Sequence, residues 1–314
     1  MKRSVLAYLL CLPGVACGEE PSGPNERPAY LQAYESNYAM YRRASPDKNT
    51  FTAHYSFRYL LSEPVNPGTQ QPQGCALATF WHCKPEYFAA YTGEFDFYWN
   101  TRPSSPVINR INNPALHMRW IAEQLSWFDL GLEHRSDGQS LDIKDADVRA
   151  RADQAYRSGD RAFFDTISRS ANYLSFTGAW PGPGSTQNQG GQLMLQLKQY
   201  VFGEESDVTW GPLSHSHPRF ADYDRLRISA IAWRSDGTEF SLHWSLGNKG
   251  LKTDSANADL AFRVRGTPTL TMYLRYHHGP MFTLSNYTQP QNSIGIGFKL
   301  IPFANAHGFN PAPY

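Results

Sequence analysis

Segments in which apolar and polar residues alternate strictly are the feature that most limits how this 314-residue chain can fold. In the segment 238–247, Phe240, Leu242 and Trp244 share one parity, whereas His243 has the other. Successive side chains of a β-strand point to opposite faces of its sheet, so this segment predicts a strand with one apolar and one polar face. The same alternation recurs in later segments: 256–265, 269–277 and 293–302.

A soluble β-sandwich would show this alternation too, but two features favour a transmembrane barrel. Most predicted strands have about 8–13 residues, which suits a tilted strand that crosses a bilayer. Their polar faces carry many charges, as the interior of a transmembrane barrel does. An open sheet edge cannot lie in lipid, so the sheet must close. We predict an all-β, antiparallel transmembrane barrel of about 12 strands: 54–63, 86–99, 115–125, 127–136, 170–180, 191–203, 222–234, 238–247, 256–265, 269–277, 281–287 and 293–302.

Composition excludes several other classes of protein. Aromatic residues make up 14% of the chain, more than a disordered chain contains. A mean hydropathy of −0.52 is too low for a helical membrane protein. A net charge of +1 gives no electrostatic basis for binding nucleic acid. The 4 cysteines are too few for a disulfide scaffold in a chain of this length.

The N-terminus, residues 1–18, has the features of a secretory signal peptide. Basic residues precede a short apolar run, and small residues at 16–18 offer a cleavage site. In the alternative, a lipoprotein signal, Cys17 becomes the acylated N-terminus. Export places the mature chain in an oxidising compartment, where Cys75 and Cys83 either form a disulfide or stay unpaired.

The mature chain is expected to consist of a periplasmic N-terminal leader, the barrel and a C-terminal extension, at 19–50, 51–303 and 304–314. One long connection, 140–168, is rich in Asp, Arg and Ala, and we expect a short helix from Asp145 to Tyr156 within a solvated loop. If turns alternate between the two ends of the barrel, this connection shares one end with the loops 100–114 and 204–221. We assign that end to the cell exterior.

A His-x-Ser pattern occurs three times, and the predicted strand faces distinguish the copies. Two copies, which begin at His54 and His243, lie on polar faces that point into the predicted lumen. In the third copy, His134 and Ser136 share the parity of Leu132, so both point toward lipid.

Asn172 shares the parity of Leu174 and Phe176 on the next predicted strand, so it also points toward lipid. Polar side chains on an apolar face are unfavourable unless they satisfy one another. We therefore interpret His134, Ser136 and Asn172 as a candidate functional site. The alternative is that they lie among hydrated lipid headgroups and have no role.

These three residue types suit nucleophilic catalysis. A serine hydroxyl is a weak nucleophile until a base accepts its proton, and the base needs a third group to fix its tautomer. Residues two apart on a strand share a face, so His134 could reach Ser136, and Asn172 could accept a hydrogen bond from the ring. Gly138, in a turn pair with Asp137, could direct its N–H toward an oxyanion.

Two motifs carry a resemblance to a known family: H-x-S-[ND]-G at 134–138 and S-R-S-x-N at 168–172. With them the chain resembles the bacterial outer-membrane phospholipase A family. Weaker matches in the same order extend the resemblance over most of the mature chain: 35–38, 45–49, 90–92, Trp99, 104–106, 113–114 and 294–298.

The resemblance implies an activity as well as a fold. It implies an enzyme of the bacterial outer membrane that hydrolyses acyl esters of phospholipids, at either glycerol position, and of lysophospholipids. Such an enzyme depends on calcium and is activated by reversible homodimerisation. Ser136 would be the nucleophile, His134 the general base and Asn172 the orienting group, while Gly138 would donate to the oxyanion. A non-catalytic barrel, either a pore or an adhesin, is the alternative.

The resemblance also implies three calcium ligands: the Ser168 hydroxyl, the Gln139 carbonyl and the carbonyl of the partner subunit's Ser104. A site made only of oxygen ligands suits Ca²⁺. The ion would polarise a water molecule that completes the oxyanion hole. In the alternative, both serines are ordinary loop residues.

The chain departs from the family's pattern at several positions. Gly93 stands where the family has an interface glutamine, and Gln139 replaces the usual arginine. The connection 140–168 is longer than the family's usual one, and the chain continues past Phe303, where such barrels usually end on an aromatic residue.

Overall fold

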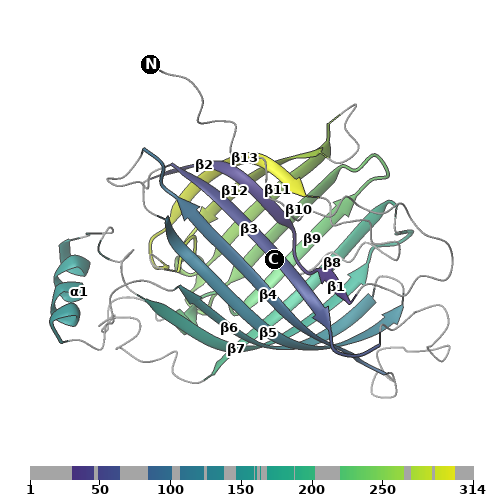
Figure 1. Ribbon diagram of the computed structural model, residues 1–314, viewed down its shortest axis with the longest axis horizontal. Coiled ribbons are helices and arrows are strands. Elements are labelled where there is room, and N and C mark those ends of the chain that lie inside the picture. The colour runs from purple at the N-terminus through teal and green to yellow at the C-terminus, as the bar shows by residue number, and fades with distance from the viewer. Residues whose placement is uncertain are drawn as a thin grey trace.

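The fold is that of a computed structural model of the chain. The structure describes residues 30–45, 49–63, 84–100, 107–123, 126–137, 146–158, 160, 163, 168–186, 188–201, 220–264, 270–284 and 287–300. In this part of the chain, twelve antiparallel strands form the closed barrel shown in Figure 1. Each strand pairs with its neighbours in the sequence, and the last strand pairs with the first to close the ring.

The barrel strands are β2 (Asn37–Ser45), β3 (Thr50–Leu60), β4 (Glu86–Phe97), β5 (Val107–Glu123), β6 (Ser126–Asp137), β7 (Arg169–Pro181), β8 (Gly190–Val201), β9 (Leu226–Trp233), β10 (Glu239–Leu246), β11 (Ser255–Arg263), β12 (Leu270–Gly279) and β13 (Gln291–Leu300). A further short strand, β1 (Leu31–Ala33), pairs with the C-terminal end of β3. The helices of the described residues are α1 (Ala146–Ser158), η2 (Phe220–Asp222) and η3 (Gly250–Lys252). None of them is long and apolar enough to cross a membrane.

The predicted all-β antiparallel barrel is confirmed, and α1 confirms the helix expected inside the connection 140–168. The connections β4–β5, β6–β7 and β8–β9 share one end of the barrel, as expected, because the strands alternate in direction. We call this end the β6–β7 end. The expected loop 100–114 is shorter than predicted, since β5 already begins at Val107.

One missed strand is β2, which lies within the segment that we placed in the periplasmic leader. Tyr38, Met40 and Arg42 point inward and are buried, while Tyr41 points outward and is exposed. Both faces therefore carry an aromatic ring, and an arginine occupies the inner face. This mixture hides the alternation in the sequence, and only pairing with β13 and β3 reveals the strand.

The predicted strand 281–287 is wrong. Met281 has φ 62°, a left-handed conformation that interrupts an extended strand. The residues that follow turn inward, so that Phe282, Thr283 and Leu284 are buried consecutively rather than alternately. The total of about twelve strands holds because β2 replaces this segment.

The predicted faces are confirmed along the described strands. On β3, His54, Ser56 and Arg58 are buried in the lumen, whereas Tyr55 and Phe57 are each 43% exposed on the outer wall. The same division holds on β10. Outward-facing aromatic and aliphatic side chains form the apolar surface that a bilayer requires.

The lumen contains many charged side chains that are paired with one another. Arg42 donates to Asp96 at 2.7 Å, and Arg275 donates to Asp259 at 2.7 Å. Buried charges are tolerated only when they are paired and hydrogen-bonded. These pairs therefore satisfy the charges that fill the interior.

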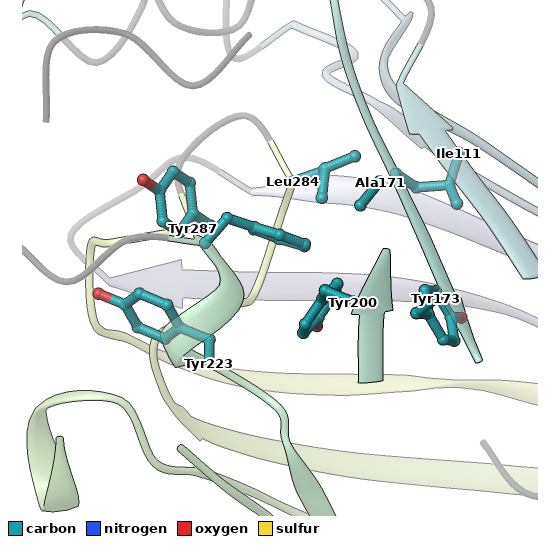
Figure 2. Packing of buried hydrophobic residues seen from close by; sticks show 8 residues of the cluster. Ile111, Ala171, Tyr173, Tyr200, Tyr223, Leu284 and Tyr287 are labelled. Carbon is teal, nitrogen blue, oxygen red and sulfur yellow. The ribbon is translucent and has the colours of Figure 1, made fainter. Parts of the chain in front are cut away.

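An aromatic cluster lies inside the β6–β7 end of the barrel. Figure 2 shows side chains from two connections packed against wall residues, and the cluster comprises Ile111, Ala171, Tyr173, Tyr200, Phe220, Tyr223, Leu284 and Tyr287. Arg169 of β7 donates to the Leu284 carbonyl at 3.1 Å. The inward fold of the segment around Leu284 thus supports the strand ends at this end of the barrel.

Several predicted parts lie outside the described residues. These are the signal peptide 1–18, the extension 304–314, and both Cys75 and Cys83. Their expected roles stay predictions.

We predict that Asp96→Ala destabilises the barrel by about 3–5 kcal/mol, because it removes one partner of a buried ion pair. Asp96 is fully buried and also accepts hydrogen bonds from Thr52 and Asn109. Urea unfolding in detergent micelles, followed by tryptophan fluorescence, measures the change. Asp236→Ala, at an exposed turn, is the control and should change stability little. An Asp96→Ala barrel as stable as the wild type would contradict this account.

Candidate active site

The outer face of β6 carries the candidate site. Asp129 and Glu133 are buried on the inner face, and Leu132 is 48% exposed on the outer face. His134 and Ser136 have the parity of Leu132 and are half-buried. The prediction that this His-x-Ser pair points outward is therefore confirmed.

Strand register brings the third residue to the pair. His134 lies directly opposite Asn172 of β7, and Ser136 lies opposite Ser170 of β7 and Asn112 of β5. Directly opposed residues of an antiparallel pair have Cβ atoms about 4.5–5.5 Å apart, which allows side-chain contact. The alignment joins segments that are separated by the long connection 140–168.

A buried contact on the inner face holds the three strands together behind the site. Glu133 of β6 accepts a hydrogen bond from Tyr173 of β7 at 2.7 Å and another from Asn113 of β5 at 3.2 Å. All three residues neighbour an outward-facing site residue in the sequence. Because one carboxylate bridges both neighbouring strands, the register of the outer face is fixed from inside.

The His134–Asn172 contact is a hydrogen bond of 2.7 Å between Nδ1 and Oδ1. An amide oxygen only accepts, so Nδ1 must carry the proton and Nε2 is left as an acceptor. This is the tautomer that a general base needs. A neutral amide orients the ring without placing a carboxylate beside lipid.

The Ser136 hydroxyl has a different partner in this conformation. It donates to the Asn112 carbonyl at 3.5 Å and not to the His134 ring. Serine and histidine share the outer face two residues apart on β6, so their side chains are neighbours on the wall. Catalytic hydrogen bonds are often long or unaligned until substrate binds.

The other two His-x-Ser pairs have structural roles in the lumen. His54 Nδ1 contacts the Ser36 carbonyl at 2.7 Å. His243 contacts the Ser229 and Ser241 hydroxyls at 2.8 and 3.1 Å. Both histidines are buried in the lumen and hydrogen-bonded to nearby groups, whereas His134 lies on the outer face of its strand.

Of the other predicted site residues, only Ser168 is described. It is exposed and directly precedes β7 at the β6–β7 end of the barrel. Gly138, Gln139 and Ser104 lie outside the described residues. Among the described residues, no group of three or more His, Cys, Asp and Glu side chains could hold a metal ion. A site of hydroxyl and carbonyl oxygens needs no such group, so the exposed hydroxyl of Ser168 fits that donor set.

Sequence reasoning missed Asn112, which lies beside Ser136. The Tyr91 hydroxyl of β4 donates to the Asn112 Oδ1 at 2.5 Å, and the Asn112 Nδ2 donates to the Arg110 carbonyl at 3.1 Å. The predicted strand began at residue 115, so Asn112 fell in a loop. The positive φ of 54° at Asn109 interrupts the alternation there, and no pattern in the sequence reveals it.

The outer wall changes from apolar to polar along these strands. Leu116, Leu132 and Leu174 face one another across β5, β6 and β7. Toward the β6–β7 end follow His134 with Asn172, and then Ser136 with its neighbours on both strands. This gradient parallels the passage from hydrocarbon to headgroups in a bilayer leaflet.

Fold and site together define a barrel of the outer-membrane type with a serine, a histidine and an asparagine on its outer wall. Its fold is similar to the outer membrane phospholipase A from Escherichia coli, with a TM-score of 0.59 at 16% identity, over 87% of this chain and 94% of that chain. An active-site mutant of the E. coli protein, in which an asparagine is replaced by alanine, gives a TM-score of 0.57 at 16% identity, over 91% and 96%.

A third similar structure is the calcium-bound dimer of the outer membrane phospholipase from Salmonella typhi. It has a TM-score of 0.59 and 14% identity, over 91% of this chain and 96% of that chain. No family model and no curated protein matches the sequence. At these identities the similarity establishes the fold.

We predict that a long-chain alkyl sulfonyl fluoride in detergent micelles labels Ser136, because this serine lies on the outer wall, near exposed leucines and beside an imidazole base. Peptide mass spectrometry locates the adduct. Ser56 and Ser245 are the internal controls, since each lies two residues after a histidine but faces the lumen. Equal labelling of the three serines would show that outward orientation does not select Ser136.

Proposed function

We propose that this chain is a calcium-dependent outer-membrane phospholipase that hydrolyses acyl esters of phospholipids and lysophospholipids, at both the A1 and A2 positions. The observation that carries the proposal is the 2.7 Å His134–Asn172 hydrogen bond on the lipid-facing wall, next to Ser136. A pore or an adhesin gives no reason for this outward polar pair. A lipid ester, by contrast, reaches the wall directly from the bilayer.

In the proposed reaction, the Ser136 Oγ attacks the acyl carbonyl carbon of a bound phospholipid. The His134 Nε2 accepts the hydroxyl proton as the Oγ–C bond forms. The resulting imidazolium is stabilised through its Nδ1–H bond to the Asn172 Oδ1. The tetrahedral intermediate then expels the glycerol oxygen, which takes the proton from Nε2 and leaves as lysophospholipid.

The second half of the reaction releases the fatty acid. Water attacks the acyl-Ser136 ester while His134 Nε2 accepts a proton from the water. Collapse of this intermediate returns the proton to the Ser136 oxygen and frees the carboxylic acid. The His134–Asn172 contact therefore serves both steps without a change of tautomer.

In this proposal the Gly138 N–H would donate to the oxyanion, and a bound calcium ion would assist it. Ser168, with the Gln139 carbonyl and the carbonyl of the partner subunit's Ser104, would hold the ion. When bound, calcium would supply positive charge near the developing oxyanion. Ser168 and Ser170 precede Asn172 on the same parity, which supports a calcium site beside Ser136.

A reversible homodimer is the proposed active form. Gly93 replaces the family's interface glutamine, and the ring of Tyr55 lies where a side chain at position 93 would project. Tyr55 and Phe57 also stack on Tyr91, with ring centroids 6.2 and 5.7 Å apart from it. An aromatic surface therefore takes the place of a polar contact in the proposed interface.

We predict that Ser136→Ala lowers phospholipid hydrolysis on the order of 10³-fold or more, and that Asn172→Ala lowers it by less. The first change removes the nucleophile, whereas the second only frees the imidazole to rotate. Release of labelled fatty acid from phospholipid in mixed micelles measures both. Ser245→Ala, in a lumen-facing His-x-Ser pair, is the matched control. An undiminished Ser136→Ala protein would end the proposal.

Calcium removal gives a separate expectation. Excess EDTA should abolish hydrolysis reversibly, and Ser168→Ala should raise the calcium concentration needed for half-maximal activity, because one oxygen ligand is lost. Titration of activity with calcium measures the shift. If wild type retained full activity in EDTA, the metal part of the proposal would fail while the triad would stand.

A further inference from the structure

An exposed arginine lies next to the candidate site on the lipid-facing wall. Arg110 is exposed, whereas its neighbours Asn109 and Ile111 are buried in the lumen, so Arg110 points outward. It stands two residues from Asn112, which is directly opposite Ser136. Two residues of a β-strand span about 7 Å.

The backbone that carries Arg110 is anchored from inside the barrel. Asn109 is fully buried and donates to both Glu94 and Asp96 at 3.2 Å. Around its positive φ of 54°, Ile108 and Asn109 are buried consecutively, and regular alternation resumes with Arg110 on the outer face. The position of Arg110 is therefore set by a polar network that contains no lipid-facing group.

Polar groups connect Arg110 to Ser136. The Arg110 carbonyl accepts one N–H of the Asn112 amide, and the Asn112 carbonyl accepts the Ser136 hydroxyl. The Tyr91 hydroxyl holds the Asn112 Oδ1 at 2.5 Å. An amide has two N–H donors, and only one of them is used by the Arg110 carbonyl.

Charge and polarity along this wall match one end of a phospholipid. On the other side of Ser136, Leu116 is 56% and Leu132 is 48% exposed, as acyl chains require. A glycerol backbone of three carbons separates the acyl esters of a phospholipid from its phosphate. An ester carbonyl placed at Ser136, with its chains along the leucines, thus brings the phosphate toward Arg110. Guanidinium groups bind phosphate oxygens through paired N–H donors.

We propose that Arg110, with the Asn112 amide, forms a subsite for the phosphodiester of the lipid substrate. This inference rests on the proposed function and deepens it. The subsite selects esters that carry a phosphate over neutral acylglycerols. Arg110 is thus a specificity-determining residue and takes no part in the transfer of protons.

The test compares dioleoylphosphatidylcholine with dioleoylglycerol, each in mixed micelles of the same uncharged detergent. Arg110→Gln should raise KM for the phospholipid about tenfold more than KM for the diacylglycerol, since a charge-assisted hydrogen bond is lost. Arg110→Lys should restore part of the preference because it keeps the charge but not the paired donors. A merely structural role would not change the ratio of the two KM values.

Arg43→Gln is the matched control. Arg43 is also exposed on the outer wall near the β6–β7 end, but it lies on β2, four strands from β6. This substitution should leave the ratio unchanged. An equal change of both KM values in Arg110→Gln, or the same ratio change in Arg43→Gln, would overturn the subsite.

A binding measurement separates failure of the subsite from failure of the proposed function. A diether phosphatidylcholine has no acyl ester, so its retention by the protein, relative to a diether glycerol, does not depend on hydrolysis. Wild type should retain the phosphate-bearing ether in preference, and Arg110→Gln should lose that preference. If the wild type cleaved neither ester, the proposed function would be contradicted. If Arg110→Gln retained the phosphate-bearing ether with the same preference as the wild type, the subsite would be contradicted.

Discussion

Hydrogen bonding between β2 and β13 closes the sheet, and the rest of the structure depends on that closure. Within a bilayer an unpaired strand edge would leave backbone groups without partners, which costs several kcal/mol per group. Closure also gives every strand an inner and an outer face. The parity of a residue in its strand then decides whether its side chain faces the polar lumen or the bilayer.

The two faces satisfy polar groups in different ways. Inside, charges such as Arg42 and Asp96 pair across strands, and Glu133 bridges β5 and β7. On the outer face of the described strands most side chains are apolar, and a polar group beside lipid is stabilised by a partner on the same wall. The His134–Asn172 bond is such a contact, and the inner bridge behind it maintains its register. The candidate site is thus an outer-face feature supported by inner-face packing.

Much of this arrangement can be predicted from the chain alone. The alternation around Leu132 and Leu174 places His134, Ser136 and Asn172 on one face, and the structure confirms their orientation. Two features escaped prediction for local reasons. The strand β2 has rings on both faces, and Asn112 follows the left-handed residue Asn109, where parity is interrupted. In both places long-range pairing overrides the local pattern.

The sequence by itself determined the fold class, the two faces of the strands and the residue types of the candidate site. Period-two patterning is a local property, so neighbouring residues suffice to read it. Only the tertiary structure decided that residue 134 meets residue 172, that Met281 turns the chain inward, and that Arg110 and Asn112 flank Ser136. These contacts depend on register between strands, and register arises from closure of the whole sheet and not from any single segment.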